Sequence, residues 1–233
     1  SLSEGFFPDR YEDWSRPVYW SVGVIAALLL FLTVLIHELA HALVAKRRGL
    51  DVPRITLFIF GGVSHLGRQP SSAGEEFQIA AAGPATSLAI AIATALGGLA
   101  LRDASEQAEA ILFYLAIVNT ALAFFNILPG FPLDGGRVLR SIAWKKTGSF
   151  RRATRIASGV GEFFGYGLLA LGFVLLLTGY LFDGLWIMFI GWFLLGAARG
   201  EAANLQLEGV LKRLRARDVM REDFPSVTPG ART

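Results

Sequence analysis

The sequence predicts an all-α, polytopic membrane protein that also contains one short re-entrant β strand or hairpin. Of its 233 residues, 53% are hydrophobic and 18% are charged, whereas soluble domains carry roughly 25% charged residues. Several apolar runs reach the roughly 20 residues that a helix needs to cross a bilayer. The chain has no cysteine, so disulfides and thiolate metal sites are excluded, and any metal must be held by His, Asp or Glu.

The apolar runs define five expected membrane-spanning helices. In chain order they cover about residues 18–44, 77–99, 110–128, 160–178 and 185–198. The second is rich in small residues around Gly83, which allow close packing in lipid and indicate a helix inside the bundle. The third ends in a segment with Pro129, Pro132 and three glycines, through which a helix cannot continue.

A short apolar segment, residues 55–63, lies between the first two expected helices. It is rich in β-forming residues and too short to span the membrane as a helix. We therefore expect a strand or hairpin that dips into the membrane surface. Backbone of this kind must be buried in protein or must line a wet cavity.

The distribution of lysine and arginine predicts the topology. Nineteen of the 22 basic residues follow the first, third and fifth expected helices, and only Arg10, Arg16 and Arg102 lie on the other side. By the positive-inside rule the basic segments and the C-terminus are cytoplasmic, and the N-terminus is outside. Because no signal sequence opens the chain, we expect one further transmembrane helix before Ser1, which would complete a six-helix core.

The chain is therefore expected to have three parts. Residues 1–16 form an extracytoplasmic segment, residues 17–200 form the membrane core, and residues 201–233 form a cytoplasmic tail. The net charge of +3 comes from basic residues beside the apolar runs, so we expect contact with the lipid bilayer and none with nucleic acid. The short loops and the lack of cysteine favour the inner (plasma) membrane of a prokaryotic cell, and the oligomeric state is left open.

Near the end of the first expected helix, His37, Glu38 and His41 form an H-E-x-x-H motif. Its two imidazoles share a helix face and can bind one zinc ion, while the glutamate acts on water. His37 lies nine residues before Lys46, which places it ~13 Å inside the basic boundary at the helical rise per residue. Ionisable groups at that depth are costly unless they serve a function. The alternative is that they pair with neighbours as structural polar groups.

A catalytic zinc site usually has three protein ligands and one open position. Asp134 follows the broken third helix on the same membrane side as the histidines, so it is the expected third ligand. It could instead cap a helix that begins at Gly135. His65, the remaining histidine, lies at the end of the β segment and is interpreted as a pocket or surface residue.

Three other polar residues are given roles. Glu38 is expected to be the general base, which takes a proton from water and passes it to the leaving amine. Asn126, at the end of the third helix, can donate to the developing oxyanion, although an interhelical hydrogen bond is an equally good interpretation. Asn119 is interpreted as structural.

The order and spacing of five motifs resemble the site-2 protease family of intramembrane zinc metalloproteases. They are the H-E-L-A-H, F-G-G-V, A-G-P, N-I-L-P and P-L-D-G-G-R sequences at residues 37–41, 60–63, 82–84, 126–129 and 132–137. The resemblance implies one zinc ion held by His37, His41 and Asp134, with Glu38 as the catalytic base, in a six-helix core. Residues 217–220 and 227–229 look like the start of a cystathionine-β-synthase-type (CBS) module, which implies a nucleotide as a partner of the longer protein.

The expected function is therefore that of an endopeptidase that cuts a transmembrane helix of a single-span substrate protein near its cytoplasmic end. The β segment, with Ile55, Leu57, Ile59, Gly61 and Gly62, is expected to bind the unwound substrate by β-augmentation. Two alternatives remain. A metal or solute transporter would use the histidines and Asp134 without needing the glutamate, and an inactive scaffold would bind transmembrane helices and lack one of the four residues, all of which are present.

Overall fold

The computed structural model describes residues 2–11, 13–52, 54–58, 61–65 and 68–211. Its elements, in chain order, are the short π-helix η1 (Leu2–Phe6), α1 (Arg16–Arg47), β1 (Arg54–Phe58), β2 (Gly61–His65), α2 (Ala73–Leu101), α3 (Glu106–Ile127), α4 (Asp134–Thr147), α5 (Phe150–Leu177) and α6 (Leu181–Leu211). The tail residues that resemble a CBS module lie outside the described residues.

The five predicted membrane-spanning helices are confirmed as α1, α2, α3, α5 and α6, which are each long and apolar enough to cross a bilayer. Three of them begin with a serine whose side chain accepts a hydrogen bond from a backbone N–H of the first turn, which satisfies a group that the helix itself leaves unpaired. These serines are Ser72 before α2, Ser105 before α3 and Ser149 before α5. The helix starts are thus encoded locally.

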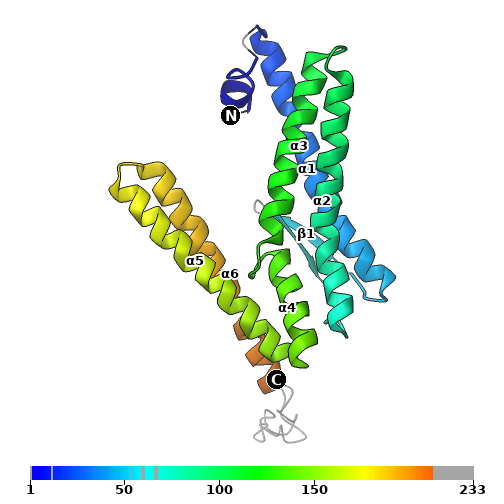
Figure 1. Ribbon diagram of the computed structural model, residues 1–233, viewed down its shortest axis with the longest axis vertical. Helices are drawn as coiled ribbons and strands as arrows, with labels where there is room; N and C mark the ends of the chain where they lie inside the picture. Colours follow the sequence, from blue (N-terminus) through cyan, green and yellow to red (C-terminus); the bar gives the residue numbers. More distant parts are fainter. Residues whose placement is uncertain (1, 12, 53, 59–60, 66–67, 212–233) are drawn as a thin grey trace, which may run out of the picture.

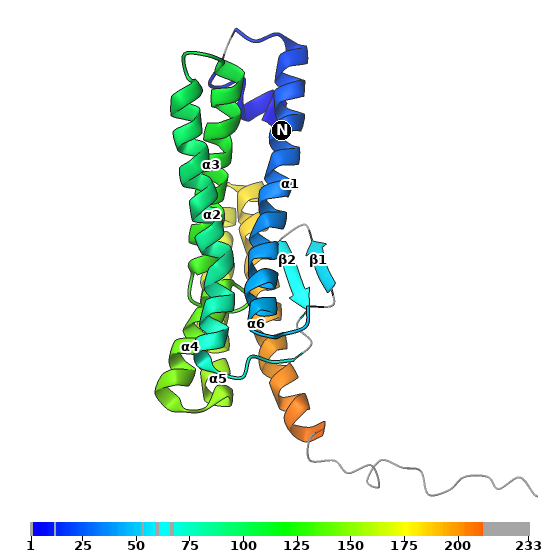
Figure 2. The ribbon, with the colours of Figure 1, turned by 90° about the vertical axis from the view of Figure 1, so that its right-hand side faces the viewer.

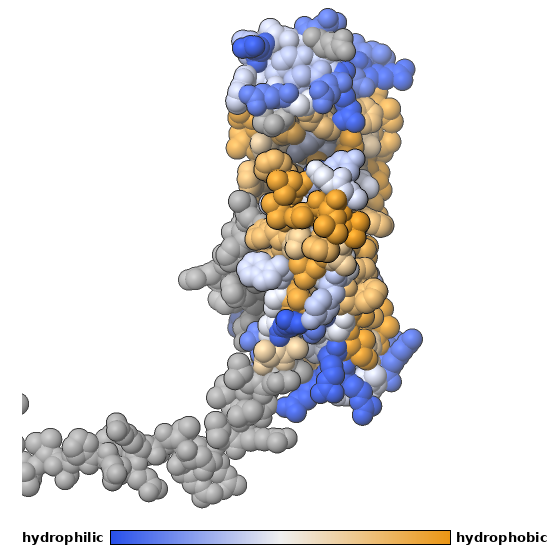
Figure 3. All heavy atoms as spheres, turned by 90° about the vertical axis from the view of Figure 1, so that its left-hand side faces the viewer, coloured by the Kyte–Doolittle hydropathy of each residue, from blue (hydrophilic) through white to orange (hydrophobic). Residues whose placement is uncertain are grey.

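Large apolar side chains are exposed all along the five helices, among them Leu28, Phe31, Phe124, Phe163 and Phe182. They form a hydrophobic belt between two polar ends of the molecule (Figure 3). A surface of this kind is stable in hydrocarbon, where backbone groups must be satisfied inside helices. The chain is a multi-pass membrane protein.

The helices form two groups that α4 joins. Helices α1, α2 and α3 pack together as one bundle, while α5 and α6 pack on each other as a hairpin that leans away from it (Figure 1). Glycines bring the hairpin backbones close together: a Cβ added at Gly172 would lie 2.6 Å from the Gly184 carbonyl oxygen. Close backbone approach through small residues is a usual way for helices to associate in lipid.

The β segment forms an antiparallel pair in which Arg54 is opposite His65 and Phe58 is opposite Gly61. Of the two strands, β2 lies nearer α1 (Figure 2). The structure thus contains the pairing of a hairpin here, and the re-entrant position in the membrane stays a prediction.

Helix α4 begins within one residue of the position at which the sequence analysis considered a helix after Asp134, and it carries part of the basic segment that follows the third expected helix. It has 14 residues and ends at Gly148, whose φ of 66° is the left-handed conformation that glycine adopts readily at a helix end. The helix is amphipathic, so its basic residues do not prevent its other face from packing on α2 and α5. It carries Asp134 at its first position.

Arg140 of α4 is a buried cation at the junction of the two groups. Its Nε donates to Oε1 of Glu76 in α2 at 2.6 Å, and its Nη1 donates to Oε1 of Glu201 in α6 at 2.7 Å. The guanidinium also lies over the rings of Phe131 and Phe150, 4.8 and 4.7 Å from their centroids. Glu76 is completely buried, so its charge depends on Arg140 for compensation.

Replacement of Arg140 by methionine is predicted to destabilise the protein by about 3–5 kcal/mol, because Glu76 would become a buried charge without a partner. Equilibrium unfolding in mixed detergent micelles measures this change. The matched control is Arg199→Met, which removes a more exposed arginine that pairs with Glu162 at 3.8 Å and contacts Tyr166. This loss should cost at most about 1 kcal/mol. Equal losses in the two variants would contradict the assigned importance of the junction.

Candidate metal centre

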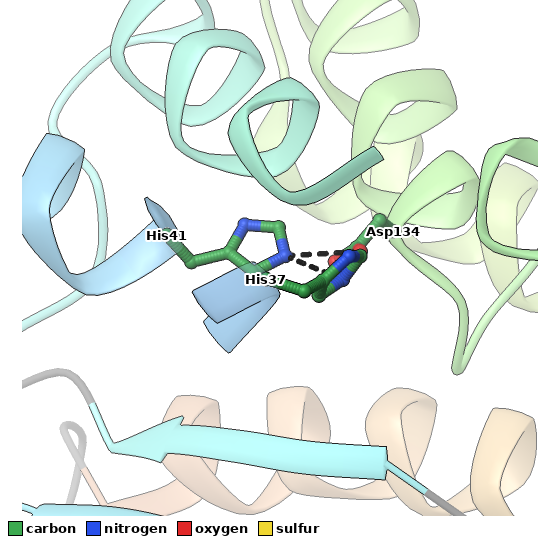
Figure 4. Close-up of side chains that lie close together, drawn as sticks. All are labelled: His37, His41 and Asp134. Atoms are coloured by element: carbon green, nitrogen blue, oxygen red, sulfur yellow. Dashed lines mark hydrogen bonds and ion pairs between the residues drawn. The ribbon is translucent and has the colours of Figure 1, made fainter. Parts of the chain in front are cut away.

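Helix α1 supplies two imidazoles to one buried point. His37 and His41 are four residues apart, so they lie on the same helix face, and each is only 3% exposed. Their Nε2 atoms are 3.2 Å apart. Figure 4 shows both rings directed toward the start of α4.

Asp134 reaches this point because the chain breaks between α3 and α4. Its Oδ2 lies 3.2 Å from Nε2 of His37 and 3.0 Å from Nε2 of His41 (Figure 4). The carboxylate occupies the first position of α4, where the helix dipole favours negative charge. The next two residues, Gly135 and Gly136, are pressed against the backbone of the preceding loop, and a Cβ on either would overlap it.

The Asp134 carboxyl is held in its ionised form. Burial alone would raise its pKa, but hydrogen bonds and charge from His37 and His41, when these imidazoles carry a proton on Nε2, outweigh burial and keep the pKa well below its ordinary value. A carboxylate that is ionised and faces two ring nitrogens is suited to binding a cation.

These three residues fit a zinc ion. Among the described residues they form a cluster whose ligand atoms all lie within 4.8 Å of one another. Ligands at the usual zinc distances and tetrahedral angles are roughly 3.3 Å apart, close to the 3.0 to 3.2 Å separations observed here. Three atoms with lone pairs repel one another at such distances unless a proton or a metal cation lies between them. The sequence prediction that Asp134 lies with the two histidines agrees with this geometry.

Helix α2 holds the other side of both imidazoles, which the sequence interpretation missed. Nδ1 of His41 donates to the Ile79 carbonyl oxygen at 2.6 Å, and Nδ1 of His37 lies 2.8 Å from Oγ of Ser87. Gly83 lies between them on the same face of α2. A Cβ added there would lie 2.6 Å from Cε1 of His41 and closer still to both Nε2 atoms. The A-G-P motif was thus interpreted correctly as a close-packing segment. Its packing partners are the imidazoles of His37 and His41.

Glu38 is buried next to the cluster, with 7% of its surface exposed. Within the described part of the chain, its carboxylate has no hydrogen-bond or ion-pair partner. Neither carboxylate oxygen is among the fully enclosed unpaired atoms of the described residues, so the group remains accessible to water. Its position is consistent with a group that exchanges protons with water.

Nδ2 of Asn126 donates to the Leu122 carbonyl oxygen within α3 at 3.0 Å, and no interhelical hydrogen bond of this side chain is found among the described residues. Its role in oxyanion stabilisation stays a prediction. Asn119 agrees with its structural interpretation: it is fully buried, and its Nδ2 donates to Leu115 O at 2.9 Å and to Thr33 Oγ1 of α1 at 3.3 Å.

The predicted substrate-binding residues lie in the β hairpin, except for one. Ile55 and Leu57 are in β1, Gly61 and Gly62 begin β2, and Ile59 lies outside the described residues. His65 is the last residue of β2. Because β2 contacts α1, the hairpin backbone runs close to the helix that carries both histidines (Figures 2 and 4).

Comparison with known proteins agrees with this fold and cluster. The sequence model of peptidase family M50 matches residues 25–103 and 101–168. The solved structure of the site-2 protease from Methanocaldococcus jannaschii superimposes with a TM-score of 0.58 at 32% identity, covering 78% of each chain. The chain therefore belongs to peptidase family M50, the site-2 protease family.

Two bacterial relatives carry the name "Putative zinc metalloprotease". The first, sll0528 of Synechocystis sp., is 38% identical over 230 residues, which cover 99% of this chain and 60% of that protein. The second, Rip3 of Mycobacterium tuberculosis, is 41% identical over 227 residues, which cover 96% and 57%. The chain thus spans about three fifths of the length of these relatives.

Replacement of Gly83 by alanine is predicted to reduce the zinc content of the purified protein severely, because the added methyl group would overlap both imidazoles. Metal analysis by mass spectrometry after purification in zinc-containing buffer measures the effect. The His37→Ala and Asp134→Ala variants provide the reference for loss of a ligand.

The matched control for this prediction is Gly97→Ala in the same helix. A Cβ at that position would make one ordinary contact, 3.4 Å from Leu112 Cδ1. This variant should keep its zinc, since alanine is in any case the better helix former. Full zinc occupancy in Gly83→Ala would mean that α2 does not press against the imidazoles.

Proposed function

We propose that the protein is an intramembrane zinc endopeptidase that hydrolyses a peptide bond in a transmembrane helix of another protein. The observation that carries this proposal is the cluster of His37, His41 and Asp134, buried in a multi-pass membrane protein beside the unpartnered carboxylate of Glu38. Family membership supports the same class of reaction.

The chain divides the reaction among a few residues. His37, His41 and Asp134 would hold the zinc, which supplies Lewis-acid polarisation when bound. Glu38 takes a proton from the attacking water as the water oxygen adds to the scissile carbonyl carbon. The same carboxyl then gives the proton to the nitrogen of the leaving amine as the C–N bond breaks. We assign to Asn126, at the end of α3, the donation of a hydrogen bond to the oxyanion.

The substrate must unwind before it can be cut, because a helix engages its carbonyl groups in internal hydrogen bonds. We assign the binding of the unwound segment to the hairpin, whose strands offer backbone groups for β-augmentation. The proximity of β2 to α1 supports this assignment. Basic residues that cluster at the end of the molecule where α1 ends and α4 lies favour cleavage near the cytoplasmic end of the substrate.

Replacement of Glu38 by glutamine is predicted to abolish cleavage of a single-span substrate while zinc content stays at the wild-type level. Glutamine has nearly the same shape, but it cannot accept the proton from water. Cleavage is followed by gel analysis of a reconstituted substrate in proteoliposomes, and zinc is measured on the same preparation.

The same variant separates the protease from a transporter. A transporter that uses only the imidazoles and Asp134 would remain active in Glu38→Gln, whereas a protease would not. Normal cleavage by this variant would disprove the assigned mechanism.

Proline substitutions at Ile55 and Leu57 are predicted to abolish cleavage and leave zinc content unchanged. Proline removes the backbone N–H that strand pairing requires. Alanine at the same two positions is the matched control, since it keeps the backbone donor and should retain much of the activity. If the proline variants cleave as well as the alanine variants, the hairpin does not hold the substrate by its backbone.

A further inference from the structure

Three residues of α2 form a row against the two imidazoles of α1. Ile79, Gly83 and Ser87 are spaced four residues apart and therefore share one helix face. The carbonyl oxygen of Ile79 accepts a hydrogen bond from His41, and Gly83 leaves room for both rings. Oγ of Ser87 lies 2.8 Å from Nδ1 of His37. The two imidazoles are thus held by two different kinds of oxygen atom.

The Ile79 carbonyl oxygen can only accept a hydrogen bond, so Nδ1 of His41 must carry a hydrogen. In the neutral imidazole the lone pair of His41 then lies on Nε2, the atom that faces Asp134. The backbone of α2 therefore selects the tautomer of His41 that can bind a metal, and this selection is independent of the side chain at position 79.

Ser87 is different because a hydroxyl group can either donate or accept. If it donated to Nδ1 of His37, the ring hydrogen would be on Nε2 and would point at His41 and Asp134, which would block coordination. If it accepts, the lone pair of His37 lies on Nε2, beside Nε2 of His41 and Oδ2 of Asp134.

We propose that Ser87 is a positioning residue that accepts a hydrogen bond from Nδ1–H of His37 and so holds this imidazole in its metal-binding tautomer and orientation. Ser87 is completely buried, so water cannot easily replace its hydroxyl oxygen. The proposal rests on the metal centre of the proposed function.

A purely structural serine would act differently. Ser158 of α5 is such a residue: it is also buried, and its Oγ has no hydrogen-bond partner among the described residues. Ser87→Ala and Ser158→Ala therefore remove the same atom from equally buried sites, and only the first removes a partner of an imidazole. The pair distinguishes metal positioning from packing.

The experiment measures zinc affinity by competition with a chromogenic chelator in detergent, using the full chain. Ser87→Ala is expected to weaken zinc binding by about 10–100-fold, the usual effect of removing a hydrogen-bond partner of a ligating histidine. Ser158→Ala should bind zinc as the wild type does. Thermal unfolding of the zinc-free proteins should be cooperative in both variants, which shows that each is folded.

Cobalt substitution gives a second readout that does not depend on cleavage. The visible absorption bands of Co²⁺ should change in Ser87→Ala and remain as in the wild type in Ser158→Ala, because only the first alters the orientation of a ligand. Equal zinc affinity and equal cobalt spectra in the two variants would overturn the role of Ser87 alone. A wild-type protein that binds neither metal would overturn the proposed function and this role with it.

Discussion

The contact of one carboxylate with two imidazoles depends on the break between α3 and α4. The imidazoles come from a helix almost a hundred residues earlier in the chain, and the break brings the carboxylate to them. An uninterrupted α3 would carry the chain onward past the histidines. Because α3 ends at Ile127 and α4 begins at Asp134, the chain turns, and the carboxylate is presented at a helix N-terminus that favours its charge. Gly135 and Gly136 allow the loop to fold back on the start of α4 without overlap.

The centre also depends on α2, which contributes none of the three ligand atoms. Because residue 83 is glycine, α2 can lie close against α1. Its Ile79 carbonyl oxygen then reaches Nδ1 of His41, and its Ser87 hydroxyl reaches Nδ1 of His37. With Asp134 on one side of the rings and α2 on the other, the imidazoles have little freedom left. Rigid placement of ligands by hydrogen bonds is what makes a metal site selective and active.

The sequence predicted much of this arrangement, and what it missed has physical reasons. Long apolar runs identify spanning helices because the bilayer sets their length, and the H-E-x-x-H spacing places two histidines on one face. The Ile79 carbonyl was not predictable, since every residue has a carbonyl group and only packing selects one. Ser87 was hidden among small residues of α2, where serine also serves as a packing residue.

The packing of α4 in the core and the Arg140–Glu76 pair were missed for a related reason. A cluster of basic residues near a membrane is usually a solvated stretch that reports topology. Here one of these residues turns inward and meets a glutamate 64 positions away in the chain. Pairing over such a separation leaves no local pattern, and the amphipathic character of a single short helix is a weak signal beside a run of positive charge.

The buried pair between Glu76 and Arg140 also has a consequence for the order of assembly. A chain made from its N-terminus presents α2 to the membrane before α4 exists. Until then Glu76, in the first turn of α2, is an acidic group without its cation, and it is most stable at the water-facing border of the bilayer. Helix α2 can therefore take its final position only after α4 has been made. The packing of α4 also brings Asp134 to the histidines, so the ligand cluster and the membrane core form in the same step.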